Sequence, residues 1–156
     1  MIIQEEDLKQ IKAVDTLPTQ YDYSQRGLIM TPAEIRFFKL LDHALADKYY
    51  VFPQIHLPAL FEHKIRGQAW FAAYAHINRK SVDFVICSRY ELKPLLAIEL
   101  DDWSHSLPHR KKRDAEVERI FAASGLPLLR FEGKQDFSVE YEYILDELRS
   151  AGIKHI

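Results

Sequence analysis

The chain has 156 residues, of which 47% are hydrophobic and 28% charged, and its formal net charge is −2 at pH 7. These values predict one soluble globular domain with a sizeable core, and they exclude an overall basic field, so any binding of nucleic acid needs a local patch. The one cysteine, Cys87, excludes an internal disulfide and a cysteine-rich zinc site, and it favours a reducing compartment. Because the N-terminal segment is acidic and has no long apolar run, we expect no membrane partner and a cytoplasmic location.

A polar N-terminal arm and one folded domain are the expected organisation. Residues 1–30 show only weak periodicity, so we assign them to the arm and residues 31–150 to the domain. The domain begins with a helix from Thr31 to about Asp47. Thr31 and Glu34 have the spacing of a capping box, and the proline that follows Thr31 is favoured at the first helical position.

A strand and a second helix are expected next. The residues from Tyr50 to Leu57 favour a strand, in which Pro53 indicates a sheet edge or a bulge. Residues 60–76 are expected to form a helix. Three aromatic side chains of this helix are expected in the core, and the alternative is a platform on which nucleic-acid bases stack: Trp70, Phe71 and Tyr74.

Two apolar runs, 81–87 and 95–101, are joined by a short polar loop and therefore predict a β-hairpin. If the hairpin is symmetric about Glu91, Asp83 lies opposite Glu99, with the two Cβ atoms about 5 Å apart. The apolar residues that point to the other face then form a core: Val82, Phe84, Ile86, Leu96, Ile98 and Leu100.

Three carboxylates, those of Asp83, Glu99 and Asp101, share one face of this hairpin because side chains alternate along a strand. Mutual repulsion destabilises such a cluster unless a cation or a basic partner is present. The cluster therefore predicts a metal site, and the alternative is a set of salt bridges with nearby arginine and lysine side chains.

A helix, a strand and a last helix complete the domain. The helix begins at Pro108 or His109 and runs to about Ala123. A strand over 126–131 follows, and then a last helix that Ser138 caps and that runs to about Arg149. Because a helix connects the hairpin to the last strand, these strands are expected to be parallel. The order of elements predicts an α/β sandwich on a small mixed sheet.

Several short motifs occur in a fixed order along the domain. They are Val82-Asp83-Phe84, Glu99-Leu100-Asp101, His105, Arg113-Asp114 and Leu129-Arg130-Phe131. In these motifs the chain resembles the PD-(D/E)XK nuclease superfamily, and most closely its branch near the very-short-patch repair endonucleases. The resemblance implies a restriction-endonuclease-like α-β-β-β-α-β core, in which helices flank a small mixed sheet.

The resemblance also implies a metal site at the hairpin. Asp83 and Glu99 correspond to the central pair of metal ligands, and the carbonyl of Leu100 completes the protein's share for Mg²⁺ or Mn²⁺. Glu34 corresponds to the acid of the first helix. The alternative for Glu34 is that its carboxylate caps that helix.

Asp101 is the main departure from the superfamily, because it stands where a lysine commonly positions or activates the attacking water. The repair-like branch shares this Glu-x-Asp pattern. His105 is the best substitute general acid or base, with an ordinary pKa of about 6.5, and Arg79 and Lys80 are further candidates. The catalytic candidates are Glu34, Asp83, Glu99, Asp101 and His105.

The densest basic run lies at the start of the helix that follows the hairpin. Cations at a helix N-terminus oppose the helix dipole, so we expect Arg110, Lys111, Lys112 and Arg113 to contact phosphates of DNA; a solvated charged face is the alternative. Arg130 is expected to balance the acid cluster or to contact phosphate. These features predict a divalent-metal-dependent, endonuclease-like phosphodiesterase acting on DNA. The alternative is a catalytically degenerate nuclease-like domain that binds nucleic acid or protein.

Overall fold

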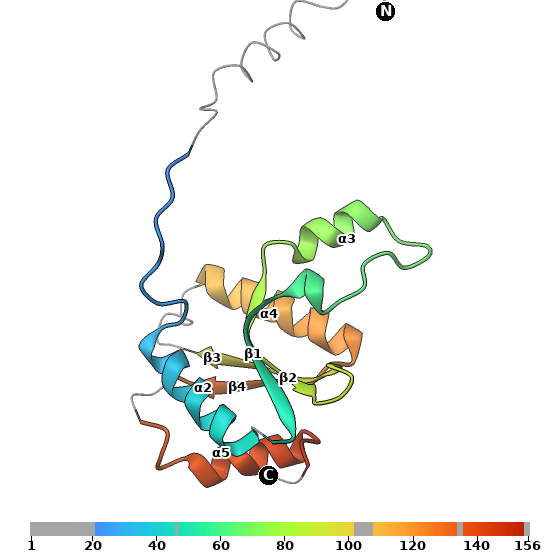
Figure 1. Ribbon diagram of the computed structural model, residues 1–156. Coiled ribbons are helices and arrows are strands. Elements are labelled where there is room, and N and C mark those ends of the chain that lie inside the picture. The colour runs from blue at the N-terminus through green and yellow to red at the C-terminus, as the bar shows by residue number, and fades with distance from the viewer. Residues whose placement is uncertain (1–20, 46, 102–107, 134–135, 155–156) are drawn as a thin grey trace, which may run out of the picture.

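The computed structural model describes residues 21–45, 47–101, 108–133 and 136–154, and of residues 108–113 it describes the backbone alone (Figure 1). Four strands and four α-helices make up this part of the chain. In chain order the elements are α2 (Pro32–Leu45), β1 (Tyr49–His56), the short 3-10 helix η1 (Leu57–Ala59), α3 (Trp70–Ile77), β2 (Ser81–Ser88), β3 (Pro94–Asp101), α4 (Pro108–Ser124), β4 (Leu128–Glu132) and α5 (Tyr141–Ser150).

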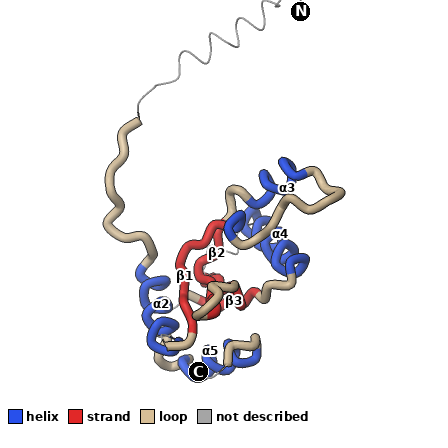
Figure 2. The backbone as a smooth tube through the Cα atoms, turned by 45° about the vertical axis from the view of Figure 1, so that its right-hand side comes forward, coloured by secondary structure: helices blue, strands red, loops and turns tan. Residues whose placement is uncertain are grey.

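The four strands form one mixed sheet in the order β1-β2-β3-β4. The β1–β2 and β2–β3 pairs are antiparallel, and β3 and β4 are parallel. The predicted α/β class, the α-β-β-β-α-β order and the parallel crossover through α4 are therefore confirmed. Helices α2 and α5 cover one face of the sheet, and α4 covers the other (Figures 1 and 2). Within the described ranges, no helix is long and apolar enough to span a bilayer.

The two faces of the sheet carry two separate hydrophobic cores. The α2/α5 core is built around Phe37, whose ring centroid lies 5.4 Å from that of Phe131 and 5.0 Å from that of Phe137. The α4 core, on the opposite face, joins apolar residues of β2 and β3 to α4; its buried members include Val85, Ala97, Val117 and Phe121. Because both faces are covered, a charged residue on either face of the sheet is at least partly enclosed.

Helix α2 begins at the capping box that the sequence predicts. The backbone N–H of Glu34 donates to Thr31 Oγ1 at 3.3 Å, and the N–H of Thr31 donates to Glu34 Oε2 at 2.5 Å. Two of the unpaired N–H groups at this end of the helix are thereby satisfied. Before the helix, residues 21–29 form no helix or strand, and Figure 1 shows them leading away from the sheet.

The edge strand β1 is irregular directly after Pro53, as the sequence indicates. Gln54 has a left-handed backbone, with φ of 53°, and is absent from the otherwise continuous pairing with β2. This irregularity shifts the alternation of side chains, so Ile55 and its partner Val82 pack into the α4 core. The prediction that Val82 shares a face with Phe84 is therefore wrong, because Phe84 packs into the α2/α5 core.

The prediction of a helix over residues 60–76 is also wrong for residues 60–69. Helix α3 begins only at Trp70, and Gly67 in the preceding loop has a φ of 92°, which a helix does not accommodate. The expected burial of the three aromatic residues of this helix is wrong as well. They are exposed to 49%, 92% and 39%, for Trp70, Phe71 and Tyr74 respectively.

The predicted register of the β2–β3 hairpin is confirmed. Phe84 pairs with Ile98, and Ile86 with Leu96, as expected for a hairpin symmetric about Glu91. A bulge between Ile86 and Cys87 interrupts this register next to the loop. At the other end, the paired residues stop at Phe84 and Ile98, one residue before Asp83 and Glu99, so the pairing of these two acids stays a prediction.

The elements after the hairpin agree with the prediction except at the start of the last helix. Helix α4 ends at Ser124, and Gly125 follows it with a φ of 75°. Helix α5 begins at Tyr141, two residues later than expected, and its N-cap residue is Glu140 and not Ser138; Glu140 makes no side-chain capping hydrogen bond.

Candidate functional site

The acidic residues of the hairpin lie at the end of the sheet where β3 and β4 terminate. Glu99 is 8% exposed, and among the described residues it is the only buried one with a charged or polar side chain. Asp83 is half-buried, and its Oδ2 accepts the backbone N–H of Leu100 at 2.8 Å. The Asp83 carboxylate thus accepts the Leu100 amide where a backbone carbonyl of β2 would accept it in a regular hairpin. This hydrogen bond fixes the Asp83 carboxylate next to β3.

Arg130 of β4 pairs with the acids of β3. The parallel register places Arg130 beside Glu99. Its Nη1 lies 2.7 Å from Asp101 Oδ1, to which it donates a hydrogen bond, and 3.3 Å from Glu99 Oε2. Burial of Arg130 lowers the pKa of its guanidinium, but the charges of Glu99 and Asp101 outweigh that effect and raise this pKa above its ordinary value. Arg130 is therefore charged at neutral pH.

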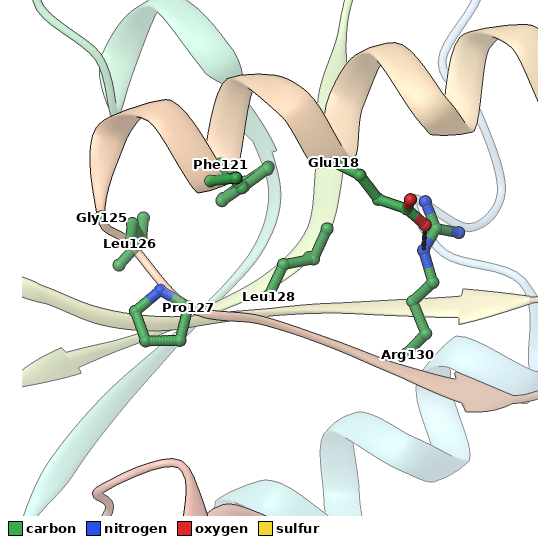
Figure 3. Close-up of a pocket in the computed structure, with 8 residues that line it drawn as sticks. Glu118, Phe121, Gly125, Leu126, Pro127, Leu128 and Arg130 are labelled. Atoms are coloured by element: carbon green, nitrogen blue, oxygen red, sulfur yellow. Dashed lines mark ion pairs between the residues drawn. The ribbon is translucent and has the colours of Figure 1, made fainter.

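A second acid, from α4, reaches the same guanidinium. Glu118 Oε1 lies 3.2 Å from Arg130 Nε, and Figure 3 shows the two side chains facing each other across the gap between α4 and β4. They form the polar end of a pocket of about 390 Å³. The rest of its lining is mostly apolar and comes from Phe121, Ala122, Gly125, Leu126, Pro127 and Leu128.

Two buried nitrogens of Arg130, Nε and Nη2, make no hydrogen bond within the described part of the chain, and of the two only Nε has an ion-pair partner, Glu118. Its Nη2 is buried and has no hydrogen-bond acceptor among the described residues. A buried donor without an acceptor costs about 1–3 kcal/mol, and more for a charged group. An added oxygen ligand at this position would remove that cost.

The Glu34 carboxylate accepts two hydrogen bonds, one from the capping box of α2 and one from Gln54, a residue that the sequence analysis did not identify as a candidate. Its Oε1 accepts the side-chain N–H of Gln54 at 2.9 Å, and its Oε2 accepts the Thr31 amide. Gln54 lies at the position of β1 that faces Asp83 in the β1–β2 register. The capping role of Glu34 is thus present, and Glu34 connects to the acid end of the sheet through Gln54.

Lys80, a candidate alternative to the missing lysine, belongs to another contact. Its Nζ lies 3.1 Å from Glu116 Oε2 of α4 and also donates to the carbonyl of His76. His76 Nε2 lies 2.5 Å from Glu116 Oε1. The hydrogen bond from Lys80, partly opposed by burial, lowers the pKa of Glu116. This cluster ties the end of α3 to α4.

Five candidates lie where the structure gives no side-chain position. His105 is outside the described residues, and Arg110, Lys111, Lys112 and Arg113 lie in the part of α4 described by its backbone alone. Their predicted roles stay predictions. The backbone does place the basic run in the first two turns of α4, the helix that supplies Glu118 to Arg130.

Residues 26–148 match the model of a family described as proteins of unknown function, DUF2726. The chain belongs to the DUF2726 family. No curated protein and no solved structure matches the chain. The acid end of the sheet in this DUF2726 chain therefore has to be interpreted from its own chemistry.

The oxygen atoms that a hard divalent cation prefers are present at this end of the sheet. The Ala97 amide donates to Pro127 and the Asp101 carbonyl accepts from Gly133, so alternate backbone groups of β3 face β4. The amide and carbonyl of Leu100 consequently face β2, the strand of Asp83. Two carboxylates and this carbonyl suit Mg²⁺, which commonly takes one or two carboxylates and completes its shell with water.

The described residues contain no group of three or more His, Cys, Asp or Glu side chains arranged to hold a metal ion. A cation at this place would rely on Asp83, Glu99 and the Leu100 carbonyl. It would also lie next to Arg130, which already contacts Glu99. The donor atoms fit a cation, and the adjacent guanidinium competes with it for Glu99.

Proposed function

We propose that this DUF2726 chain is a divalent-metal-dependent, endonuclease-like phosphodiesterase that acts on DNA. The observation that carries the proposal is the burial of the Glu99 carboxylate. Glu99 lies two residues before Asp101 on β3, and the last paired residues of the hairpin, Phe84 and Ile98, directly adjoin Asp83 and Glu99. Burying a carboxylate is costly unless a cation or several donors offset the cost. Sites with paired carboxylates at strand ends provide the ligands for metal-assisted hydrolysis of phosphodiesters.

In this proposal Asp83, Glu99 and the Leu100 carbonyl hold Mg²⁺ or Mn²⁺. The bound metal supplies Lewis-acid polarisation of the phosphate and a water of lowered pKa. The hydrogen bond from the Leu100 amide fixes the orientation of Asp83. Glu34 acts at a distance, by orienting Gln54 on the neighbouring strand.

Arg130 neutralises the negative charge that develops on the phosphate. Its unused Nη2 donor suits a phosphate oxygen, and its charge is secure because its pKa is raised. His105 moves the proton that Arg130 cannot accept. The basic run from Arg110 to Arg113 contacts the DNA backbone, which supplies most of the sequence-independent affinity. The cytoplasmic location expected from the acidic N-terminal segment stays a prediction.

Metal-dependent stabilisation is the first test. At ten times the dissociation constant, a metal that binds only the folded state adds about 1.4 kcal/mol of stability. For a chain of this size, that stabilisation raises the melting temperature by about 3–6 °C. An Asp83→Asn, Glu99→Gln variant should lose the shift, whereas Asp146→Asn, which alters an exposed acid on α5, should keep it. An equal shift in the double variant would place the metal elsewhere.

Cleavage is the second test. Duplex, nicked, flapped and single-stranded DNA are incubated with Mg²⁺ or Mn²⁺, and products are resolved on denaturing gels. His105→Ala should lower turnover by about 10²–10⁴, the usual contribution of a positioned general acid or base, and should leave the metal-induced melting shift intact. If no substrate is cut, the catalytic proposal fails.

The second candidate function is a nuclease-like domain without catalysis that binds nucleic acid or protein. The favouring observation is that Arg130 already pairs with Glu99 and Asp101, so a guanidinium takes part of the role expected of a cation. For this candidate, DNA binding persists in EDTA while the metal-induced shift and cleavage are both absent.

A further inference from the structure

Helix α3 presents three aromatic side chains to solvent. Phe71 is 92% exposed, and Trp70 and Tyr74 are exposed to 49% and 39%. Together with His63 and Lys64 they line a pocket of about 180 Å³. Large aromatic side chains that gather on a surface in this way mark a binding site, because leaving them in water forgoes the gain from burial.

The loop before α3 fixes this aromatic surface without a ligand. The indole N–H of Trp70 donates to the carbonyl of Ile65 at 2.9 Å. The side-chain amide of Gln68 donates to the carbonyl of His63 at 2.6 Å, and the His63 ring centroid lies 5.1 Å from that of Tyr74. The rings of Trp70 and Tyr74 are thus oriented in advance, which lowers the entropic cost of binding.

The charge around the aromatic surface is positive. Residues 60–80 contain four Lys or Arg residues and one acidic residue, Glu62, in a chain whose net charge is −2. Lys64, Arg66 and Arg79 are exposed, while Lys80 is engaged by Glu116. Exposed aromatic rings interleaved with basic side chains are typical of surfaces that bind single-stranded nucleic acid.

We propose that α3 and the loop 61–69 bind an unpaired stretch of a nucleic-acid strand. Bases stack on Phe71 and its aromatic neighbours, and Lys64 and Arg66 contact the phosphates. Duplex bases are stacked on one another, so rings that protrude like Phe71 select a strand whose bases are free. The inferred substrate class is nucleic acid with an unpaired strand. That this strand is a substrate, and not only a ligand, rests on the proposed phosphodiesterase function.

The position of α3 agrees with such a role. His76 and Lys80, at the end of α3 and in the turn after it, contact Glu116 on α4. Glu118, further along α4, reaches Arg130 at the acid cluster. Figures 1 and 2 show α3 beside α4, away from α2 and α5. A strand bound on α3 therefore lies on the same side of the sheet as the acid cluster.

Fluorescence anisotropy with labelled oligo-dT of about 12 nucleotides, in EDTA, tests the proposal; this length falls within the usual site size of such surfaces. Phe71→Ala, Tyr74→Ala and their combination should weaken binding, by about fivefold or more for each base that no longer stacks. Lys64→Ala, Arg66→Ala should lower the log–log salt slope by about 0.7 for each phosphate that the variant no longer neutralises. Tyr90→Ala is the matched control, because Tyr90 is 98% exposed in the β2–β3 loop and should not affect binding.

Three results would overturn the proposal. The first is wild-type affinity in the Phe71→Ala, Tyr74→Ala variant, which places the strand elsewhere. The second is preference for a fully paired duplex over oligo-dT. The third is a wild-type dimer in light scattering that dissociates in the same variant, since that result assigns the rings to a protein interface. Circular dichroism melts of every variant verify folding, and the exposure of Phe71 makes its replacement safe for stability.

Failure of this inference and failure of the proposed function give different results. If oligo-dT binds through Phe71 and no substrate is cut with metal, the strand-binding surface stands and the phosphodiesterase fails. If DNA is cut with metal and the Phe71→Ala, Tyr74→Ala variant cuts flapped, single-stranded and duplex substrates as the wild type does, the phosphodiesterase stands and the strand-binding surface fails.

Discussion

Replacing Arg130 by methionine tests whether the acid cluster depends on this guanidinium. The side chains of Arg130 and Glu99 are exposed to only 20% and 11%, and Arg130 also contacts Asp101 and Glu118. Removing one partner of a buried ion pair costs about 3–5 kcal/mol, because a charge stays buried without its partner. The partial exposure of this pair favours the lower end, about 3 kcal/mol, which lowers the melting temperature by roughly 6–12 °C in a chain of this size.

Arg149→Met is the matched control for this experiment. Arg149 Nη1 lies 2.6 Å from Asp146 Oδ1, a contact as short as that of Arg130 with Asp101, but the two side chains are exposed to 41% and 70%. Exposed pairs contribute about 0–1 kcal/mol. Thermal and urea unfolding of both variants provide the measurement. If Arg130→Met is no more destabilising than Arg149→Met, the burial of the Arg130 contacts has no energetic consequence and the reasoning is refuted.

The Arg130→Met variant also separates the two candidate functions. Titrating Arg130 cannot make the same test, because its raised pKa keeps the guanidinium charged up to the ordinary pKa of an arginine. If Asp83 and Glu99 bind a divalent cation, removing the competing guanidinium should increase the melting shift produced by Mg²⁺ or Mn²⁺ beyond that of the wild type. A salt-bridge network without a metal site predicts no shift in either protein.

Three further predictions concern single contacts. Thr31→Ala removes the hydroxyl that accepts the Glu34 amide and should destabilise the fold by about 0.5–2 kcal/mol, as measured by urea unfolding. Glu116→Gln should lower the melting temperature slightly at neutral pH. Because the pKa of Glu116 is lowered in the folded protein, the stabilisation by its carboxylate is present above pH 4.5 and is lost as the pH falls below that value. The melting temperatures of the wild type and the variant should therefore converge in acid. Lys111→Ala and Lys112→Ala should each reduce the log–log salt slope of duplex binding by about one unit, and an unchanged slope would assign these lysines to a solvated face.

The hairpin register could be predicted because two independent constraints agree on it. A short loop limits the pairing of two strands, and a slip by one residue would move Ile86 and Ile98 out of the α2/α5 core. The same constraints predict that Asp83 and Glu99 are neighbours, and Asp83 indeed accepts the amide of Leu100, the residue after Glu99. The first helix was predictable for a similar reason, since the reciprocal hydrogen bonds of Thr31 and Glu34 depend only on local spacing.

The features that the sequence did not reveal depend on contacts between distant segments. The exposure of Trp70 follows from the Ile65 hydrogen bond and the left-handed Gly67, neither of which changes the helical spacing of the aromatic residues. Gln54 carried no signal of its own, although the proline before it indicated an irregular strand. The ion pair of Glu118 with Arg130 requires the packing of α4 on β4, which residue patterns along one element do not specify.

The structure clarifies what the acid at position 101 changes. The wider superfamily that the chain resembles commonly has a lysine there, and this chain has Asp101 with Arg130 Nη1 at 2.7 Å. A positive charge therefore remains at this place, but it comes from β4 instead of β3. Arginine can stabilise a developing negative charge, yet it cannot accept a proton at any pH at which the chain folds. In the proposed phosphodiesterase, charge stabilisation and proton transfer, which one lysine can combine, are therefore performed by different residues, and that division makes His105→Ala the decisive test of the proposed catalysis.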